Sequence, residues 1–263
     1  MTVLSIQDHG DQGWRQPRGF GFARQHALQP LAVDEVGRVS DGMPVAFRQL
    51  DGRWQAVAVM APVDGLNLYV ARDARWRAPF VPAALRVYPF ALEDASRALA
   101  LWPDFQPEPA GAVEVKPFFV SGQLSPELHR VRAFLRTLAE GVNAADAPLR
   151  FLDQRGVLRP WSPQPESGKD IGGDLLSGLF QVDTYALDGL SDADWISLRR
   201  ANALPWLHAH LDSLYHLRRF RTLAASLASP SGEDSTAPEA VAVDDLLAAM
   251  ANEIDAYQGD QEP

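Results

Sequence analysis

The pattern of apolar and polar positions between residues 43 and 92 predicts an antiparallel β-sheet. Residues 45–50 alternate between two faces, as a strand does, and the Asp51-Gly52 turn signal indicates a hairpin. The hairpin leads into residues 54–60, which are almost continuously apolar, so we expect this second strand to be buried on both faces. Further strands are expected over residues 66–71, 86–92 and 99–102.

Apolar residues recur at helical spacing in the C-terminal half of the chain. The Ser125-Pro126 pair is a typical helix start, and this helix is expected to continue to Gly141. Ser191 is followed three positions later by an acidic residue, which predicts a capping box at the start of another helix. Helices are also expected over residues 146–155 and 205–226, a short strand over 180–182, and either a strand or a short helix within 28–42. These elements predict an α+β fold, with an N-terminal antiparallel sheet packed with C-terminal helices.

The composition of the chain changes after Ala228, which predicts a boundary between residues 1–228 and residues 229–263. The first part of this tail is rich in Pro, Gly, Ser and acidic residues and is typical of a linker. Apolar residues at 4-3-4-3 spacing then predict one amphipathic helix, which would dock on its own body or on a partner. These are Val243, Leu247, Met250, Ile254 and Tyr257. Within the body, residues 159–178 are expected to form a long loop, which is often a functional feature.

Composition and charge exclude several classes of protein. The chain has no cysteine, which excludes disulfides, thiolate metal sites and a cysteine nucleophile. Its formal net charge is −10, so we expect no binding to nucleic acid or anionic lipid. The apolar runs are far shorter than the ~18–20 residues of a membrane span, and the N-terminus has no signal-peptide pattern. We therefore expect a cytoplasmic protein without membrane insertion.

Three polar residues on the expected helix over 205–226 are candidate metal ligands. His208, Asp212 and His216 are four residues apart, so they share one face of a helix. Two imidazoles and a carboxylate are donors that suit Zn²⁺ or Fe²⁺. The alternative is an exposed polar face in which Asp212 pairs with a neighbouring His.

A second candidate site consists of polar and aromatic residues at turns around the expected sheet. An Arg between aromatic rings can hold a carboxylate or a sugar. The alternative is that these side chains stabilise the core. The residues are Asn67, Arg75, Trp76, Arg86 and Tyr88. A phosphate loop is not predicted, because Lys169 is followed by Asp170 rather than Ser or Thr.

The central stretch resembles the SapC family, which is named after genes found beside surface-layer genes. The matching segments are Met43–Phe47, Gly65–Val70, Arg75–Trp76, Phe80–Phe90, Gly178–Asp183 and Ala203–Pro205, together with His210, Leu211 and Ser213. The family has no established catalytic residues, so the resemblance implies none here, although it draws attention to His210 as a binding residue. Its members are often encoded near TonB-dependent receptors, halogenase-like proteins and cupin-like oxygenases, which implies an accessory role in nutrient uptake or peptide modification. A peptide-transporter permease shares the name but spans the membrane.

The leading hypothesis is a non-enzymatic accessory protein that binds a protein or peptide partner, and no motif predicts a cofactor. One alternative is a metal-dependent hydrolase or oxygenase that uses His208, Asp212 and His216. Another is a sugar- or peptide-binding protein that uses Trp76 and Arg86 to hold a small ligand.

Overall fold

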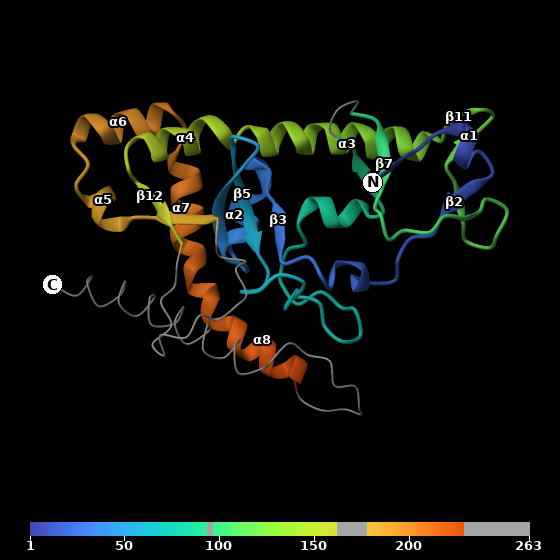
Figure 1. Cartoon of the computed structure of the whole chain (residues 1–263), viewed down its shortest axis with the longest axis horizontal. Helices are drawn as coiled ribbons and strands as arrows, with labels where there is room; N and C mark the ends of the chain where they lie inside the picture. The colour runs from blue at the N-terminus through green and yellow to red at the C-terminus, as the bar shows by residue number, and fades with distance from the viewer. Residues whose placement is uncertain (94–96, 162–177, 229–263) are drawn as a thin grey trace. The chain divides into compact units, whose positions relative to one another are not determined.

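Strands β4 (Val45–Leu50) and β5 (Arg53–Val59) form the hairpin expected from the sequence. Asp51 and Gly52 at its turn have positive φ angles of 50° and 73°, the backbone that a two-residue type I′ turn requires. Residues Ala56 to Val59 of β5 are fully buried, which confirms the expectation that both of its faces are covered. The computed structural model describes residues 1–93, 97–161 and 178–228 (Figure 1).

The hairpin lies at the centre of a five-stranded antiparallel sheet. The strand order is β12-β13-β4-β5-β3, and the other three strands are β3 (Leu28–Pro30), β12 (Leu158–Pro160) and β13 (Leu179–Val182). β13 confirms the short strand expected over residues 180–182. The sheet is thus assembled from distant parts of the chain rather than from the N-terminal part alone.

Two of the expected strands are wrong in whole or in part. Residues 66–71 form no strand, because the Asn67 carboxamide oxygen accepts a hydrogen bond from the backbone N–H of Tyr69 at 2.9 Å, which bends the backbone into a turn. Within residues 86–92, the first residues continue a 3₁₀ helix, η2 (Ala83–Val87), and only β6 (Phe90–Leu92) is extended. β6 pairs with β7 (Leu99–Leu101) in a separate sheet.

The chain divides into two compact units. Unit 1 consists of residues 1–18 and 83–141, and unit 2 of residues 19–82 and residue 142 onward. The body expected as one domain over residues 1–228 therefore has two centres of packing. The boundary expected at residue 228 and the tail helix lie outside the described residues, as do residues 162–177 of the expected loop.

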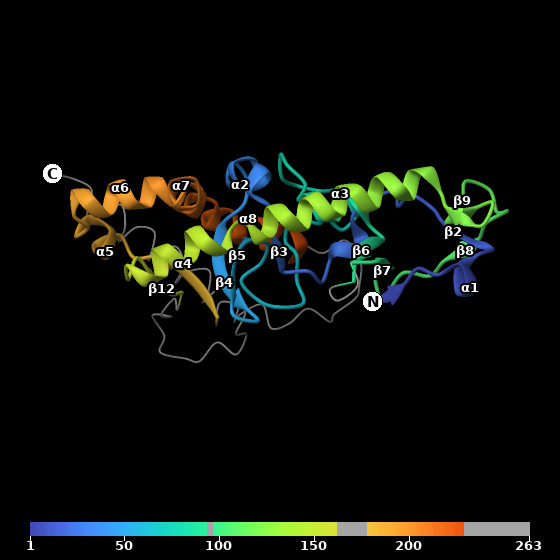
Figure 2. The ribbon, with the colours of Figure 1, turned by 90° about the horizontal axis from the view of Figure 1, so that it is seen from above.

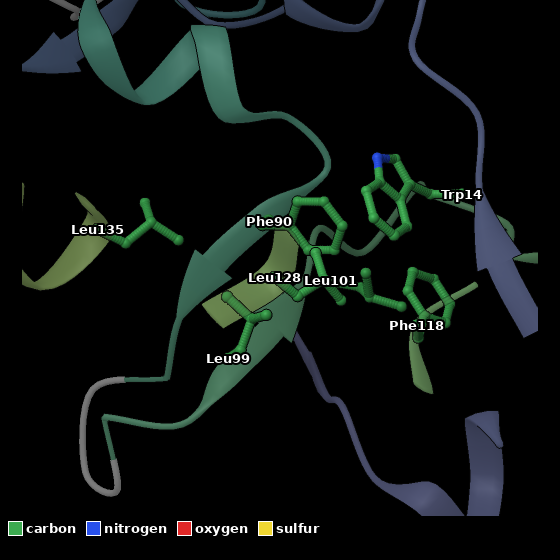
Figure 3. Packing of buried hydrophobic residues seen from close by; sticks show 7 residues of the cluster. All are labelled: Trp14, Phe90, Leu99, Leu101, Phe118, Leu128 and Leu135. Atoms are coloured by element: carbon green, nitrogen blue, oxygen red, sulfur yellow. The ribbon is translucent and has the colours of Figure 1, made fainter. Parts of the chain in front are cut away.

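Unit 1 is built around an aromatic core (Figure 3). The Trp14 ring stacks on Phe118, with centroids 5.7 Å apart and planes 5° apart, and it meets Phe90 edge-on at 5.1 Å. The long helix α3 (Pro126–Asn143), which confirms the helix expected from Ser125, adds Leu128 and Leu135 to this core. The remaining elements of unit 1 are β1 (Thr2–Val3), α1 (Ile6–His9), β2 (Gln12–Trp14), β8 (Glu108–Pro109), β9 (Lys116–Pro117), β10 (Phe119–Val120) and β11 (Gln123–Leu124).

Helices surround the five-stranded sheet of unit 2. α7 (Leu204–Ser213) packs against β4, β13 and α2 (Val33–Ser40), while α4 (Asp146–Gln154) packs against β5. The expected helix over 205–226 is divided, because the 3₁₀ turn η3 (Leu214–Leu217) separates α7 from α8 (Arg218–Ala228). The other elements are η1 (Gly21–Ala23), α5 (Thr184–Asp188) and α6 (Asp192–Arg200). No helix in the described part of the chain is long and apolar enough to cross a membrane.

Candidate functional site

His210 is a fully buried residue of α7 that joins two strands of the sheet. Its Nδ1 donates to the carbonyl oxygen of Val45 at 2.7 Å, and its Nε2 accepts from the N–H of Val182 at 3.1 Å. These two bonds require the neutral imidazole that carries its proton on Nδ1. Burial lowers the pKa of His210 to about 4, and the hydrogen bond to Val45 offsets part of this effect. Both ring nitrogens are therefore used within the fold.

The histidine takes the place of a backbone hydrogen bond. β13 pairs with β4 through Leu179 opposite Arg48 and Phe180 opposite Phe47. Continued by two residues, this antiparallel register would set Val182 opposite Val45. Instead, the imidazole of His210 lies between Val182 and Val45 and bonds to both backbones. It therefore connects β13 to β4 where their direct backbone pairing ends.

Ser213, one turn along α7, completes the same attachment. Its Oγ accepts from the N–H of Val45 at 2.8 Å and donates to the carbonyl oxygen of His210 at 2.7 Å. Both backbone groups of Val45 are thus satisfied by side chains of α7 rather than by a neighbouring strand. The spacing of residues along the chain could not predict that His210 and Ser213 bind the backbone of Val45, because Val45 lies 165 and 168 positions before them.

The structure does not bring His208, Asp212 and His216 together as a metal-binding group. His208 and Asp212 are exposed on α7, whereas His216 lies in η3, where a 3₁₀ turn advances about 120° per residue and breaks the four-residue stripe. Burial, then the Arg219 charge, lower the pKa of His216, while a hydrogen bond with the Ser40 backbone opposes this shift. Among the described residues, no three His, Cys, Asp or Glu side chains form a group that could hold a metal ion.

Asn67 and Trp76 both belong to unit 2 and take part in its packing. The Asn67 amide nitrogen donates to the carbonyl oxygen of Ala23 at 3.0 Å, and its oxygen caps the turn at Tyr69. Trp76 stacks on Tyr69 at 6.0 Å, and its indole N–H donates to the carbonyl oxygen of Phe80 at 2.8 Å. Arg75 is exposed and pairs with Asp73 at 2.5 Å. The polar atoms of Asn67 and Trp76 are thus engaged by their own unit.

Arg86 and Tyr88 belong to unit 1. Arg86 is exposed in η2. Tyr88 is half-buried and meets Trp102 and Phe105 edge-on at 5.2 and 5.9 Å. Burial, and then the nearby Asp104 carboxylate, raise the pKa of Tyr88, so its hydroxyl stays protonated at neutral pH. The candidate residues of the turns around the expected sheet are therefore divided between the two units.

Two consecutive helices of unit 2 expose large apolar side chains, a feature that was not predicted from the sequence. Tyr185 on α5 is 90% exposed, Ile196 on α6 is 52% exposed and Trp195 is 37% exposed. We call these three residues the α5–α6 surface. Figures 1 and 2 show that a short connection joins α5 to α6 in unit 2. A large apolar side chain in water is ordinary when single, but several from consecutive helices are typical of a protein-binding surface.

Local hydrogen bonds fix the two helices that carry the α5–α6 surface. Asp183 caps α5 by accepting from the N–H of Ala186 at 3.1 Å. Ser191 and Asp194 form the capping box expected at the start of α6, and the Ser191 hydroxyl is the main cause of the lowered pKa of Asp194. On the inner side, Leu187 and Leu198 are buried. Each helix is thus anchored by one buried leucine and capped at its start, while the three apolar side chains are exposed to solvent.

Exposed charged residues precede and follow Trp195 and Ile196 in the sequence. Asp188 and Asp192 are exposed before the apolar pair on α6, and Arg199 and Arg200 are exposed after it. Binding surfaces typically combine an apolar centre with a charged, solvated rim of this kind. The signal was present in the sequence as Trp195 and Ile196 in an otherwise polar helix, but only the fold shows which face is outside.

Comparison with known proteins identifies a family. The model of the SapC family matches residues 4–220, most of the chain. No curated protein and no solved structure matches the sequence.

Proposed function

We propose that this chain, which belongs to the SapC family, is a non-enzymatic accessory protein that binds a protein or peptide partner through the α5–α6 surface. The observation that carries the proposal is the outward position of Tyr185, Trp195 and Ile196 on two helices whose starts are capped. The partner segment would present apolar side chains to this surface, since the exposed rim charges are of both signs.

The chemistry of the three side chains supports binding rather than catalysis at this surface. Tyr and Trp offer large contact areas with few rotatable bonds, and Trp and Tyr are enriched among residues that dominate binding energy. Covering apolar surface stabilises a complex by roughly 25 cal/mol per Å² before the entropy of association is subtracted. Because the rim charges are balanced, affinity should depend only weakly on salt.

The setting implied by the family resemblance suggests where the partner is found. Members encoded near TonB-dependent receptors and modifying enzymes are accessory to nutrient uptake or peptide modification. We propose that the partner is a component of such a system and that this chain binds it without transforming it.

Affinity capture from native extract tests the proposal. The bait is the full chain, and the test bait carries Tyr185→Ser, Trp195→Ser and Ile196→Ser. We expect a protein that is captured by the wild type to be lost with the triple variant, and its purified form to bind the wild type at least about tenfold more tightly, because hot-spot truncations typically cost 2 kcal/mol or more.

A matched control uses apolar residues exposed elsewhere. Tyr215→Ser in η3 and Val113→Ser in unit 1 remove exposed apolar side chains (58% and 82% exposed) without touching α5 or α6. This control bait should capture the same protein as the wild type. Equal capture by the wild type and the triple variant would show that the partner does not bind through the α5–α6 surface.

A further inference from the structure

Helix α3 has an apolar inner face and a cationic outer face. On the inner face, Leu128 and Leu135 recur at helical spacing and lie in the core of unit 1. The opposite side of the helix carries three arginines within seven positions. Arg130 and Arg136 are exposed, and Arg132 is half-buried. We call these three residues the α3 arginines.

The α3 arginines keep their positive charge. Within residues 1–93, 97–161 and 178–228, no carboxylate forms an ion pair with any of them. Glu127 in the first turn of α3 is engaged with Lys116, whose Nζ donates to its Oε1 at 2.8 Å. The other acid of the helix, Glu140, is exposed in the last turn. The outer face is therefore cationic, although the chain has a formal net charge of −10.

The spacing of the α3 arginines is unfavourable for the helix alone. Arg132 and Arg136 are four positions apart, so their like charges lie side by side and repel each other. The Arg132 Nη2 donates to the Nδ1 of His129 at 3.2 Å, and this neutral acceptor does not cancel its charge. The same bond restrains the Arg132 guanidinium, which lowers the entropy lost when a ligand binds it. A carboxylate bound between Arg132 and Arg136 would relieve their repulsion.

An exposed aromatic ring lies beside the α3 arginines. Phe134 is 38% exposed and follows Arg130 by four positions, so these two side chains are neighbours on the helix surface. Ala133, with its small side chain, lies between this pair and the pair of Arg132 and Arg136. The outer face thus combines cations with an apolar contact, which is complementary to a peptide that carries acidic and apolar side chains.

We propose that the α3 arginines and Phe134 form a second interaction surface, which binds a short acidic segment of a partner protein. Guanidinium groups pair with carboxylates through two parallel hydrogen bonds, a geometry that an extended acidic segment can meet at successive side chains. An apolar side chain of the same segment would cover Phe134. This surface belongs to unit 1 and the α5–α6 surface to unit 2, so the two proposals can fail independently.

The size and charge of the surface favour an acidic peptide over a nucleic acid or a membrane. Six positions separate Arg130 from Arg136, which is about 9 Å along a helix. A nucleic acid or an anionic membrane extends beyond this distance and is repelled by the negative net charge of the chain. A short acidic segment needs to approach only the α3 arginines, so it meets less of this repulsion.

A synthetic peptide tests the proposal on the full chain. The probe is a short peptide of glutamates around a central phenylalanine, and the control peptide has glutamine in place of each glutamate. At about 50 mM NaCl, we expect the glutamate peptide alone to shift the backbone N–H signals of residues 129–137, and its dissociation constant to rise about threefold or more at about 500 mM. Arg130→Gln with Arg136→Gln should weaken binding about threefold to tenfold, the range expected for two exposed ion pairs.

A matched control separates α3 from the overall charge of the chain. Arg53→Gln with Arg221→Gln removes two exposed arginines outside α3 and changes the net charge by the same amount. This variant should bind the glutamate peptide as the wild type does, and so should the triple serine variant of the α5–α6 surface. The double variant of α3 should keep the thermal stability of the wild type, because it removes the repulsion between Arg132 and Arg136.

Equal weakening in the two double variants would show that binding follows net charge rather than α3, and would overturn the proposal. A glutamate peptide that leaves the signals of residues 129–137 unchanged would also overturn it. The same holds if a single-stranded oligonucleotide, or vesicles of phosphatidylglycerol, bind the α3 arginines more tightly than the glutamate peptide does, because the surface would then recognise phosphates.

Discussion

His210 lies at the point where the ladder between β13 and β4 ends, and its neutral ring replaces the backbone bond that would continue it. From the sequence it is one of three histidines within nine residues, a pattern that suggests ligand binding. The fold assigns each of the three a different environment: exposed for His208, fully buried for His210 and half-buried for His216. Of the three candidate metal ligands, only His208 and Asp212 are exposed on the surface of α7.

The burial of His210 predicts that stability falls in mild acid. The unfolded chain takes up a proton near pH 6.5, whereas the folded ring stays neutral until about pH 4. Because the unfolded state binds more protons between these values, the free energy of unfolding is highest above pH 6.5 and falls as the pH approaches 4. The loss attributable to this ring is about 3 kcal/mol, measured by urea unfolding at several pH values.

His210→Gln isolates this effect, because a carboxamide can also donate to Val45 and accept from Val182 but does not titrate. In this variant the free energy of unfolding should depend much less on pH between about 4 and 6.5. The exposed His208→Gln should keep the pH dependence of the wild type. An NMR titration of the wild-type ring reads the pKa directly. A value near 6.5 would contradict the assignment even if the variant fails to fold.

At the scale of single helices and strands, the sequence predicted best where the signals are local. The capping residues of α6 and the periodicity of α3 lie within the helices that they specify, so both were found. The strand expected over residues 66–71 failed because Asn67 bonds to the backbone two residues later. The place of β13 beside β4 was not visible, since these strands are about 130 residues apart and no local pattern records their pairing.

The capping box of α6 predicts a link between helix stability and partner binding. Ser191→Ala removes the hydroxyl that accepts from the Asp194 N–H at 3.3 Å, and should destabilise the start of α6 by about 1 kcal/mol. Hydrogen exchange in residues 192–196 should quicken, and affinity for the partner should fall because Trp195 and Ile196 are less ordered.

Ser197→Ala is the matched control on the same helix. The Ser197 hydroxyl bonds back to the carbonyl oxygen of Ala193 at 2.8 Å, an interaction that adds little to a helix interior. Because Ala is the better helix former, this variant should keep or slightly raise helix stability. An equal loss in both variants would show that the cap does not specify α6.

For the whole molecule, the chain divides into two compact units. Patterning identified apolar segments but not which segments share a core: Trp14 and Phe118 are far apart in sequence, yet their rings stack. The α+β class was predictable because helical and alternating patterns are clear along the chain, whereas the division into units depends on contacts between distant segments.

The aromatic core of unit 1 predicts a large effect from one substitution. Phe118 is fully buried, and Phe118→Ala should lower the free energy of unfolding of unit 1 by about 3–5 kcal/mol. Hydrogen exchange should lose protection in β6, β7 and the first turns of α3. Phe134→Ala, the same change at a side chain that is 38% exposed, should cost far less. Comparable losses for the two variants would contradict the core defined by Trp14 and Phe118.

The central claim is that a partner covers Tyr185, Trp195 and Ile196. The most direct measurement is hydrogen exchange of the full chain with and without the captured partner at saturating concentration. The account predicts slower exchange within residues 184–200, with no such slowing when the bait carries the three serine substitutions. Unchanged exchange in α5 and α6, with protection confined to other helices or to unit 1, would contradict it.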